Sequence, residues 1–511
     1  MLTSTKGIWK VIGASSVGTL IEWYDFYIFG SLATVIATQF FPQTNPTAAL
    51  LSTLATFAAG FIVRPFGALV FGRLGDLVGR KYTFLLTLII MGGSTFAIGL
   101  VPSYSSIGFA APIIVLLLRL LQGLALGGEY GGAATYVAEH APPDKRGFYT
   151  SWIQTTATLG LFVSLGVILL VRHGLDSDVN VSIQKFNAWG WRIPFLVSVV
   201  LVGVSIYIRL KMNESPLFSK LKSEGKTSIN PLKESFGHKT NLKMVLLALF
   251  GATMGQGVIW YTGQFYAQSF IETVCKVDFE QSRTILIWAI LFATPLFVVF
   301  GSWSDKVGRK WIMLGGMLLG IIFYRPIYKQ FLNYTDVAAN VSIEPLATSE
   351  QVITTNNNND RTITTTSIVK TFADGSAYTQ KTMDTVFTDL SRTAAKGSPV
   401  YTNKKLTTSV YWKLVFLVFV QIVFVTMVYG PIAAFLVEMF PTRIRYTSMS
   451  LPYHIGNGVF GGLTPFIALL LTTINTGDRL VGLMYPIIVS GVCFVIGAFY
   501  ISNKKDPDVS D

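Results

Sequence analysis

Long apolar segments dominate the pattern of hydrophobic and polar positions along the chain. A helix that crosses a membrane needs about 20 mostly apolar residues, and twelve segments approach that length. Helices are favoured over strands because the segments are continuous and do not alternate over about ten residues. The predicted spans lie near residues 11–36, 48–71, 83–101, 110–135, 148–171, 192–210, 242–270, 284–302, 311–328, 411–437, 447–472 and 480–502. The pattern predicts an all-α polytopic membrane protein.

A charged hairpin occurs twice between apolar segments. Residues 72–81 read Gly-Arg-Leu-Gly-Asp-Leu-Val-Gly-Arg-Lys and residues 301–310 read Gly-Ser-Trp-Ser-Asp-Lys-Val-Gly-Arg-Lys, so six of ten positions match. A duplicated hairpin indicates two related six-helix halves, and transporters commonly build such halves around one central site. The candidate gating residues, whose contacts would form in one conformation and break in another, are Asp76, Arg80, Asp305 and Arg309. A tight turn with solvated charges is the alternative interpretation.

A second repeat locates an insertion. Residues 139–151 are echoed by residues 438–448, at a separation of 299 positions, whereas the hairpins are 229 apart. The difference of 70 residues corresponds to residues 331–410, which are rich in Thr, Ser and Asn and are expected outside the cell. Residues 361–372 favour a strand and residues 373–376 a hairpin turn. A small external β-containing appendage and a disordered polar linker are both compatible with this composition.

Composition and charge agree with a membrane protein. The chain is 51% hydrophobic and 13% charged, whereas soluble domains carry about 25% charged residues. The net charge of +13 does not indicate nucleic acid, because 22 Lys and Arg residues fall in alternate short loops and six in the opposite loops. Basic loops stay cytoplasmic, so both termini are expected inside the cell. The first apolar segment is too long for a cleaved signal peptide.

These features predict the organisation of the chain. The expected parts are an N-terminal half (1–208), a central cytoplasmic loop (209–243), a C-terminal half (244–330 and 411–502), the external insertion (331–410) and a cytoplasmic tail (503–511). Two cysteines and four histidines form no metal-binding pattern, and no phosphate-binding loop of an ATP-driven pump is present. We therefore expect a transporter without cofactors that is not an enzyme.

Ionisable residues inside the predicted spans are candidates for proton coupling. Asp25 and Glu22 are three residues apart, so they share a face of the first span. Intramembrane charges are costly and usually mark a pore, a cavity or a partner, and burial disfavours the charged form of a carboxylate. Arg119 is the only arginine deep in the fourth span, and Glu129 follows it. Structural pairing of these charges is the alternative to a role in coupling.

Several polar and aromatic residues are candidates for a substrate cavity. Arg119 could hold a substrate carboxylate through two parallel hydrogen bonds, or it could be the permanent partner of Asp25 or Glu129. Arg64 is a second candidate, but Pro65 follows it and a structural role is favoured. The predicted wall residues are Gln122, Gln256, Trp260, Tyr261 and Asn457. For Trp260, an interfacial aromatic belt is the alternative, and Tyr453 and His454 lie on faces next to Asn457.

Together, these motifs resemble those of the major facilitator superfamily, and within it the metabolite:proton symporters, such as the proline/betaine, shikimate, α-ketoglutarate and citrate permeases. The resemblance covers nearly all of residues 8–330 and 411–502. It rests on the hairpin repeat and on the segments at 22–26, 64–67, 119–123, 127–130, 139–147, 191–195 and 214–216. The insertion at 331–410 departs from the family pattern. The fifth span lacks the Gly-Pro pair of the drug:proton antiporters, which favours symport or uniport.

The resemblance implies a secondary active transporter that takes up a small polar metabolite, either an organic acid or a zwitterionic osmolyte, with protons by alternating access. The resemblance also implies a bacterial plasma membrane as the location. The expected partners are this substrate, the proton and membrane lipid, and the protein is expected to act as a monomer. Two other functions remain open. One is a facilitator or antiporter of the same fold without proton coupling. The other is a transporter-like receptor that uses the external insertion to bind a partner.

Overall fold

The computed structural model describes residues 5–78, 80–128, 130–210, 236–337, 345–349, 352–358, 361–387, 395–440, 445–475 and 477–502. It divides into two compact units. The first unit comprises Met1–Tyr266, Ile290–Tyr324 and Gln421–Asp511, and the second comprises Ala267–Ala289 and Arg325–Val420.

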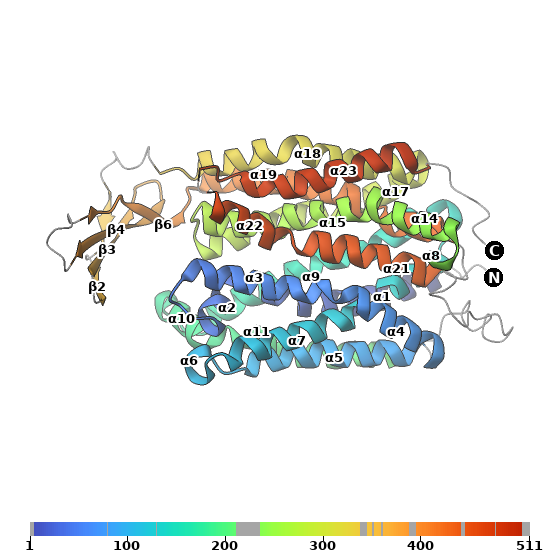
Figure 1. The fold of residues 1–511 in the computed structure, drawn as a ribbon, viewed down its shortest axis with the longest axis horizontal. Coiled ribbons are helices and arrows are strands. Elements are labelled where there is room, and N and C mark those ends of the chain that lie inside the picture. Colours follow the sequence, from blue (N-terminus) through green and yellow to red (C-terminus); the bar gives the residue numbers. More distant parts are fainter. Residues whose placement is uncertain are drawn as a thin grey trace. The chain divides into compact units, whose positions relative to one another are not determined.

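Helices make up most of the described chain (Figure 1). In the N-terminal part they are α1 (Thr5–Ser31), α2 (Ala33–Phe40), α3 (Pro46–Ile62), α4 (Arg64–Val78), α5 (Arg80–Leu100), α6 (Tyr104–Ile107), α7 (Ala110–Gly127), α8 (Tyr130–His140), α9 (Arg146–Gly174), α10 (Val179–Lys185) and α11 (Arg192–Leu210). In the C-terminal part they are α14 (Lys239–Ala248), α15 (Met254–Tyr261), α16 (Ala267–Ser269), α17 (Phe279–Val307), α18 (Arg309–Tyr334), α19 (Thr408–Tyr429), α20 (Ile432–Met439), α21 (Arg445–Tyr453), α22 (Thr464–Ile474) and α23 (Met484–Tyr500).

The helices confirm the predicted spans. Nine helices of the described residues are long and apolar enough to cross a membrane, and eleven spans result if each of two bent pairs counts as one. The bent pairs are Ser15–Ser31 with Ala33–Phe40 and Val179–Gly190 with Arg192–Ile208. The shorter apolar helix Leu85–Leu100 occupies the place of the span predicted at 83–101. Each of the twelve predicted segments therefore coincides with a helix, in the bundle of two six-helix halves expected from the repeat.

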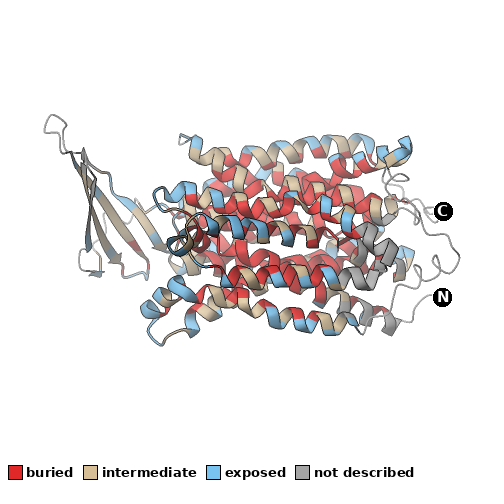
Figure 2. Cartoon of the chain, turned by 60° about the horizontal axis from the view of Figure 1, so that its bottom comes forward, coloured by how far each residue is buried: buried red, intermediate tan, exposed pale blue. Residues whose placement is uncertain are grey.

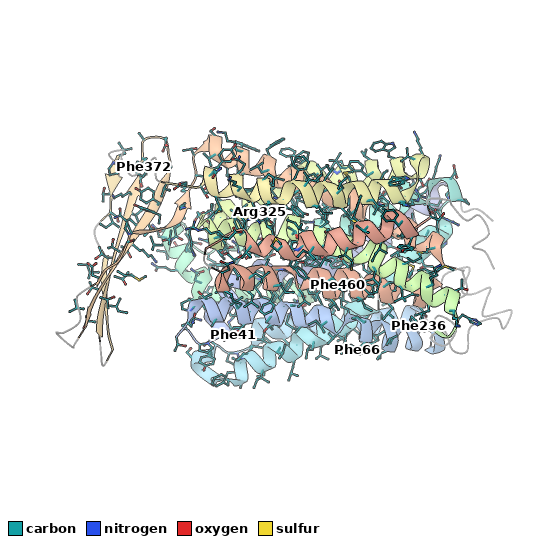
Figure 3. The ribbon with its side chains drawn as sticks, turned by 45° about the horizontal axis from the view of Figure 1, so that its top comes forward. Phe41, Phe66, Phe236, Arg325, Phe372 and Phe460 are labelled. Atoms are coloured by element: carbon teal, nitrogen blue, oxygen red, sulfur yellow. The ribbon has the colours of Figure 1, made fainter. Side chains whose placement is uncertain are left out.

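The exposed faces of the helices indicate whether water or lipid surrounds them. Buried residues follow the inner faces of the helices, whereas exposed residues lie on their outer faces (Figure 2). Many exposed residues are large and apolar. Phe66, which is 60% exposed, projects from α4 (Figure 3), and Phe499 is 80% exposed. Water would leave so many exposed apolar side chains unfavourably solvated, but lipid tails do not. The described chain is thus a multi-pass integral membrane protein.

A stripe of glycines brings α7 against α3 and α4. A β-carbon on Gly123 would overlap the carbonyl oxygen of Gly60, and one on Gly127 would overlap the carbonyl oxygen of Arg64. Small residues at such positions let two membrane helices approach closely. This seam fixes the backbone of Arg64 at the start of α4, directly after the break that ends α3 at Ile62.

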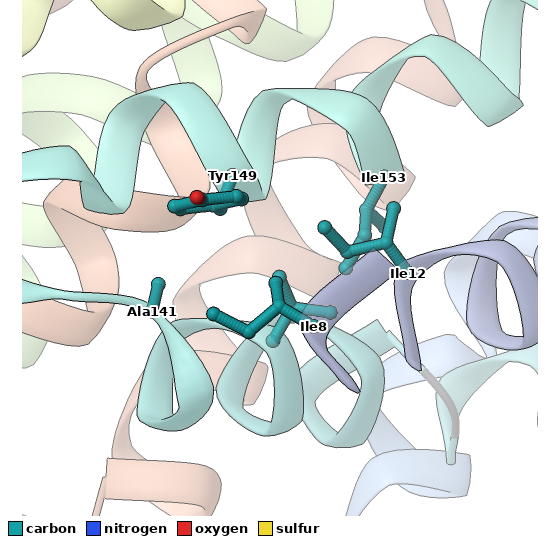
Figure 4. Packing of buried hydrophobic residues seen from close by; sticks show 6 residues of the cluster. Ile8, Ile12, Ala141, Tyr149 and Ile153 are labelled. Carbon is teal, nitrogen blue, oxygen red and sulfur yellow. The ribbon is translucent and has the colours of Figure 1, made fainter. Parts of the chain in front are cut away.

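The first turns of α1 pack on α8 and α9. Ile8 and Ile12 contact side chains of both helices in a small apolar cluster (Figure 4). The remaining buried members are Val137, Ala141, Tyr149 and Ile153. Trp9 adds edge-to-face contacts with Phe148, Tyr149 and Trp152 at ring-centroid distances of 6.3, 6.1 and 5.5 Å. The start of α1 is therefore fixed against the start of α9.

The second unit carries an antiparallel six-stranded sheet, which confirms the β-containing appendage and not the disordered linker. Its strands are β1 (Ala347–Thr348), β2 (Val352–Asn358), β3 (Arg361–Thr371), β4 (Ala377–Phe387), β5 (Ala395–Lys396) and β6 (Val400–Lys405). Strands β3 and β4 form the predicted hairpin. In its turn, Gly375 has a φ of 80° and Asp374 accepts hydrogen bonds from the side chain and backbone N–H of Ser376, which hold the pKa of Asp374 below its ordinary value.

Backbone contacts attach this sheet to the helical part of the same unit. The N–H of Lys404 donates to the carbonyl of Lys276 at 2.9 Å, and the N–H of Asp278 donates to the carbonyl of Lys404 at 2.9 Å. The Lys404 side chain donates to the carbonyl of Thr335 at 2.8 Å, near the end of α18. Strand β6 is therefore tied to the segments on which the helices of this unit begin and end.

Candidate functional site

Asp25 lies at the centre of the buried polar groups of α1. Its side chain is fully buried, because α1 packs closely on α9 and α11. The hydroxyl of Ser198, on α11, donates to its Oδ1 atom at 2.5 Å. Within the described part of the chain, Oδ2 has no hydrogen-bond partner. Glu22, one turn earlier on α1, is 1% exposed. The structure therefore places both predicted carboxylates inside the bundle.

Arg119 of α7 is also fully buried, but it is held by neutral groups. Its Nη1 donates to Oε1 of Gln122 at 2.6 Å and to the carbonyl of Phe26 at 3.2 Å, and Nη2 donates to the carbonyl of Phe57 at 3.4 Å. Gln122 in turn donates to Thr95 at 2.6 Å. The direct pair of Asp25 with Arg119, considered from the sequence, is not formed in this structure, because each residue bonds to other groups.

Arg64 differs from Arg119 in its hydrogen bonding. It is 0% exposed, and none of its three guanidinium nitrogens has a hydrogen-bond partner among the described residues. Its Cζ atom lies 4.0 Å from the ring centroid of Phe61, 4.4 Å from that of Phe26 and 5.3 Å from that of Trp23. Aromatic faces stabilise a cation without using its N–H groups. The guanidinium is thus held in place with all its donors unused.

The C-terminal half contributes a polar network that faces this region. Gln256 of α15 donates to Asn457 at 3.2 Å, and Asn457 donates to the hydroxyl of Tyr453 at 3.2 Å. The hydroxyl of Tyr453 shares a hydrogen bond of 2.9 Å with that of Tyr429. All four side chains are buried. The structure thus brings together two of the predicted wall residues, Gln256 and Asn457, and connects them with two tyrosines.

An aromatic stack crosses from the N-terminal to the C-terminal half. The rings of Trp23 and Tyr27 stack at 4.9 Å, and Tyr27 stacks on Trp260 at 5.3 Å. Tyr261 meets Phe61 edge-on at 5.1 Å. Trp260 and Tyr261 are 1% and 0% exposed, so an interfacial aromatic belt is wrong for Trp260. Both predicted wall residues lie where α15 faces α1 and α3.

The second copy of the repeated hairpin joins the two halves at one end of the bundle. Both carboxylate oxygens of Asp305 accept hydrogen bonds, from the backbone N–H groups of Gly147 and Phe148 at 2.9 Å each. Arg309 contacts Asp305 at 2.7 Å and Glu438 at 2.9 Å. The first N–H groups of a helix lack partners within it and carry a partial positive charge. Asp305 therefore caps α9 across the interface between the halves.

Three predicted site residues are not described in full. Glu129 lies outside the described residues, and the side chains of Asp76 and Arg80 lie in a segment of which only the backbone is described. Most of the predicted central loop, residues 211–235, also lies outside the described chain.

Sequence reasoning missed several residues of this region. Nothing in the sequence distinguishes Ser198 as a site residue, because a single serine in an apolar span is common. Tyr27 and Tyr429 are part of the region as well, and only their position inside predicted spans could have drawn attention to them. Within the described residues, no group of three His, Cys, Asp or Glu side chains could hold a metal ion. The described region combines hydrogen-bond donors, aromatic faces and the buried carboxyl groups of Asp25 and Glu22.

Known proteins resemble the chain along most of its length. Residues 10–230 match the family described as Sugar (and other) transporter. The inner membrane metabolite transport protein YhjE of Escherichia coli is 32% identical over 93% of this chain and 90% of that protein. The α-ketoglutarate permease of the same organism is 30% identical over 92% of this chain and 88% of its own length.

A solved structure shows the same fold. The xylose transporter XylE from E. coli, in a partially occluded inward-open conformation, superposes with a TM-score of 0.64 over 98% of this chain and 99% of that chain. The two sequences are 14% identical.

Proposed function

Because the chain belongs to the major facilitator superfamily and is a metabolite transporter, we propose that it is a secondary active symporter that takes up a small polar metabolite together with protons. The two halves would expose one central site to either side of the membrane in turn. Gln122, Gln256, Trp260, Tyr261 and Asn457 would form the wall of that site.

Asp25 is the residue on which the proton coupling mainly rests. It is a carboxyl group inside a membrane span. One of its oxygens is bonded to Ser198, and the other has no hydrogen-bond partner among the residues that the structure describes. A carboxyl group in such a place exchanges a proton when its surroundings change between apolar and polar. Arg119 could supply that change, because its present partners are neutral and it could turn toward a carboxylate. Glu22 and Glu129 remain further candidates for the proton path.

The contact of Asp305 with α9 supports alternating access. It links the halves at one end of the bundle through two hydrogen bonds to backbone N–H groups, and Arg309 extends the link to Glu438. Such a contact must break when the halves separate at that end. By the repeat, Asp76 and Arg80 would serve the matching contact of the other half. The hairpins would thus set the balance between the two conformations.

Uptake into proteoliposomes tests the proposal. The purified chain is reconstituted, and radiolabelled α-ketoglutarate, proline and glycine betaine are offered with and without an inward proton gradient. At least one of them should accumulate above its external concentration only when the gradient is present, and a protonophore should abolish the accumulation. Equal uptake with and without the gradient would indicate a facilitator instead.

A further inference from the structure

Arg64 lies in the middle of the candidate site as a buried cation that forms no hydrogen bond through its guanidinium with any described residue. Buried polar groups in native proteins are nearly always hydrogen-bonded, so an unbonded group needs an explanation. An unpaired buried charge is destabilising because it has lost its water shell. Arg64 lacks partners on Nε, Nη1 and Nη2 among the described residues. A purely structural arginine would be expected to bond to nearby carbonyl groups.

Arg119 provides the comparison within the same molecule. It is equally buried, contacts the same aromatic ring of Phe26 at 4.1 Å, and satisfies two of its nitrogens with Gln122 and two backbone carbonyls. Nearby groups can therefore satisfy a guanidinium in this region. Arg64 is instead surrounded by the faces of Phe61, Phe26 and Trp23, which hold the cation and leave its N–H groups free.

Most of the polar groups around Arg64 come from the C-terminal half, and Tyr27 of α1 adds one from the N-terminal half. Tyr261, Tyr429 and Tyr453 lie within electrostatic range of its guanidinium. The Tyr261 hydroxyl lies beside Arg64 without forming a hydrogen bond of good geometry. His454 is buried within electrostatic range of Arg64, and neither of its ring nitrogens has a partner in the described chain. A guanidinium, hydroxyls and an imidazole together favour an anionic ligand.

Close contacts with two glycines fix the position of Arg64. Arg64 begins α4, where Gly127 of α7 contacts its carbonyl oxygen so closely that no β-carbon would fit. On the other side, a β-carbon added to Gly458 would lie 3.4 Å from Cδ of Arg64. Gly458 belongs to the same π-helical segment as Asn457, His454–Gly461. The Arg64 side chain is therefore located at the interface between the halves.

We propose that Arg64 binds a carboxylate of the transported metabolite through two parallel N–H···O hydrogen bonds, and that the tyrosines and Asn457 of the C-terminal half bind the rest of it. The inference rests on the proposed function and assigns to Arg64 the recognition of the substrate's carboxylate. It assigns Arg119 a different role, because Arg119 is already bonded. A substrate held this way would contact both halves at once, so its binding would favour the conformation in which they are closed around it.

Ligand binding to the purified wild type and two variants tests the proposal. The probes are α-ketoglutarate, proline and glycine betaine, and the control ligands are choline, which matches glycine betaine without the carboxylate, and xylose. Binding is read from tryptophan fluorescence and from ligand-dependent thermal unfolding. The wild type should bind carboxylates and not the control ligands. Arg64→Gln should weaken carboxylate binding at least about 100-fold, and Arg64→Lys, which keeps the charge without the planar fork, about tenfold.

A second measurement separates this role from a structural one. Without ligand, Arg64→Gln should raise the unfolding temperature, because it removes an unpaired buried charge, whereas Arg119→Gln should lower it by breaking existing hydrogen bonds. Wild-type binding of choline or xylose as tight as that of the carboxylates would overturn the proposal. Unchanged carboxylate affinity in Arg64→Gln would overturn it as well. Proton-driven uptake by the wild type is scored separately, so the proposed function can stand when this inference fails.

Discussion

The carboxylate of Asp305 accepts a hydrogen bond from the backbone N–H of Gly147 at 2.9 Å, although the two residues are 158 positions apart in the chain. The neighbouring N–H of Phe148 bonds to the other carboxylate oxygen. This contact joins the repeated hairpin of the C-terminal half to the beginning of α9 in the N-terminal half. It relates the sequence repeat directly to an interface that would open and close in the proposed alternating access.

Asp305→Asn should slow transport without preventing membrane insertion. Asparagine keeps the shape of the side chain, but it loses the charge that strengthens both hydrogen bonds and the contact with Arg309. Charge-assisted hydrogen bonds contribute about 1.5–3 kcal/mol, and a change of about 1–2 kcal/mol shifts a two-state equilibrium roughly 5- to 30-fold. The initial rate of uptake, normalised to the amount of protein in the membrane, measures the effect.

Lys306→Gln is the matched control for this variant. It also changes the charge by one on the same turn, but Lys306 is exposed and should leave uptake unchanged. Asp76→Asn should slow transport as Asp305→Asn does, because the hairpin is duplicated. Normal uptake by both aspartate variants at normal expression would contradict a gating role for the hairpins.

Asp25→Asn should abolish accumulation driven by a pH gradient while retaining exchange of substrate across the membrane. The amide imitates the protonated carboxyl group permanently, so the site can still alternate but cannot release a proton in each cycle. Accumulation should fall at least about tenfold, and counterflow should stay within about threefold of the wild type. Both are measured in the same proteoliposomes.

Ser198→Ala is the companion variant, because it removes the only hydrogen bond that the structure gives to Asp25 from a described side chain. It should shift the pH dependence of uptake but retain accumulation. If Asp25→Asn still concentrates substrate when pH is the only energy source, Asp25 is not the coupling residue. Glu22 and Glu129 would then be tested in the same way.

The fold could be predicted from the sequence because it follows from features of short segments, such as the length of an apolar span. Span length follows from the thickness of the membrane. The two hairpins revealed the duplication, and the different separation of the second repeat gave the length of the insertion. Burial of Asp25 and Arg119 followed from their position inside apolar segments. These predictions need no knowledge of which helices face one another.

The partners of the site residues could not be predicted in the same way. Spacing along a helix shows which residues lie on the same face of that helix. It does not show which other helix packs against that face, so Ser198 and Tyr429 were missed. Helix periodicity also failed locally, because residues Thr262–Tyr266 form a π-helix directly after α15. In a regular α-helix, Gln264 would share a face with Gln256 and Trp260, because the three residues are spaced by four positions. It instead donates to Thr158 of α9 at 3.4 Å, because the wider turn rotates the residues that follow.

Removal of residues 345–399, with a short Gly-Ser linker in their place, should leave uptake intact. The repeats show that each half is complete without the insertion, and the shortened chain keeps the contacts of Lys404 with Lys276, Asp278 and Thr335. External segments tolerate such changes when the backbone that remains is still bonded. Uptake of the metabolite panel by the deletion variant is the measurement.

A longer deletion that extends to residue 405 serves as the comparison, because it removes Lys404 and its backbone contacts. It should lower the unfolding temperature relative to the shorter deletion. If the shorter deletion folds normally but loses uptake, the sheet takes part in transport. Weak uptake by the full chain would favour the alternative of a transporter-like receptor.

Gly127→Ala should destabilise the protein and reduce uptake, whereas Gly93→Ala should do neither. A β-carbon on Gly127 would overlap the carbonyl oxygen of Arg64, and one on Gly93 would meet nothing within 4 Å. Overpacking a tight contact costs about 1–3 kcal/mol, while alanine in an open helix position is favoured over glycine by about 1 kcal/mol. Unfolding temperature in detergent and carboxylate binding are measured for both variants. Because the strain at Gly127 acts on the backbone of Arg64, carboxylate affinity should fall along with stability. Equal unfolding temperatures for the two variants would show that α7 can move away from α4, and that the glycine seam does not fix the position of Arg64.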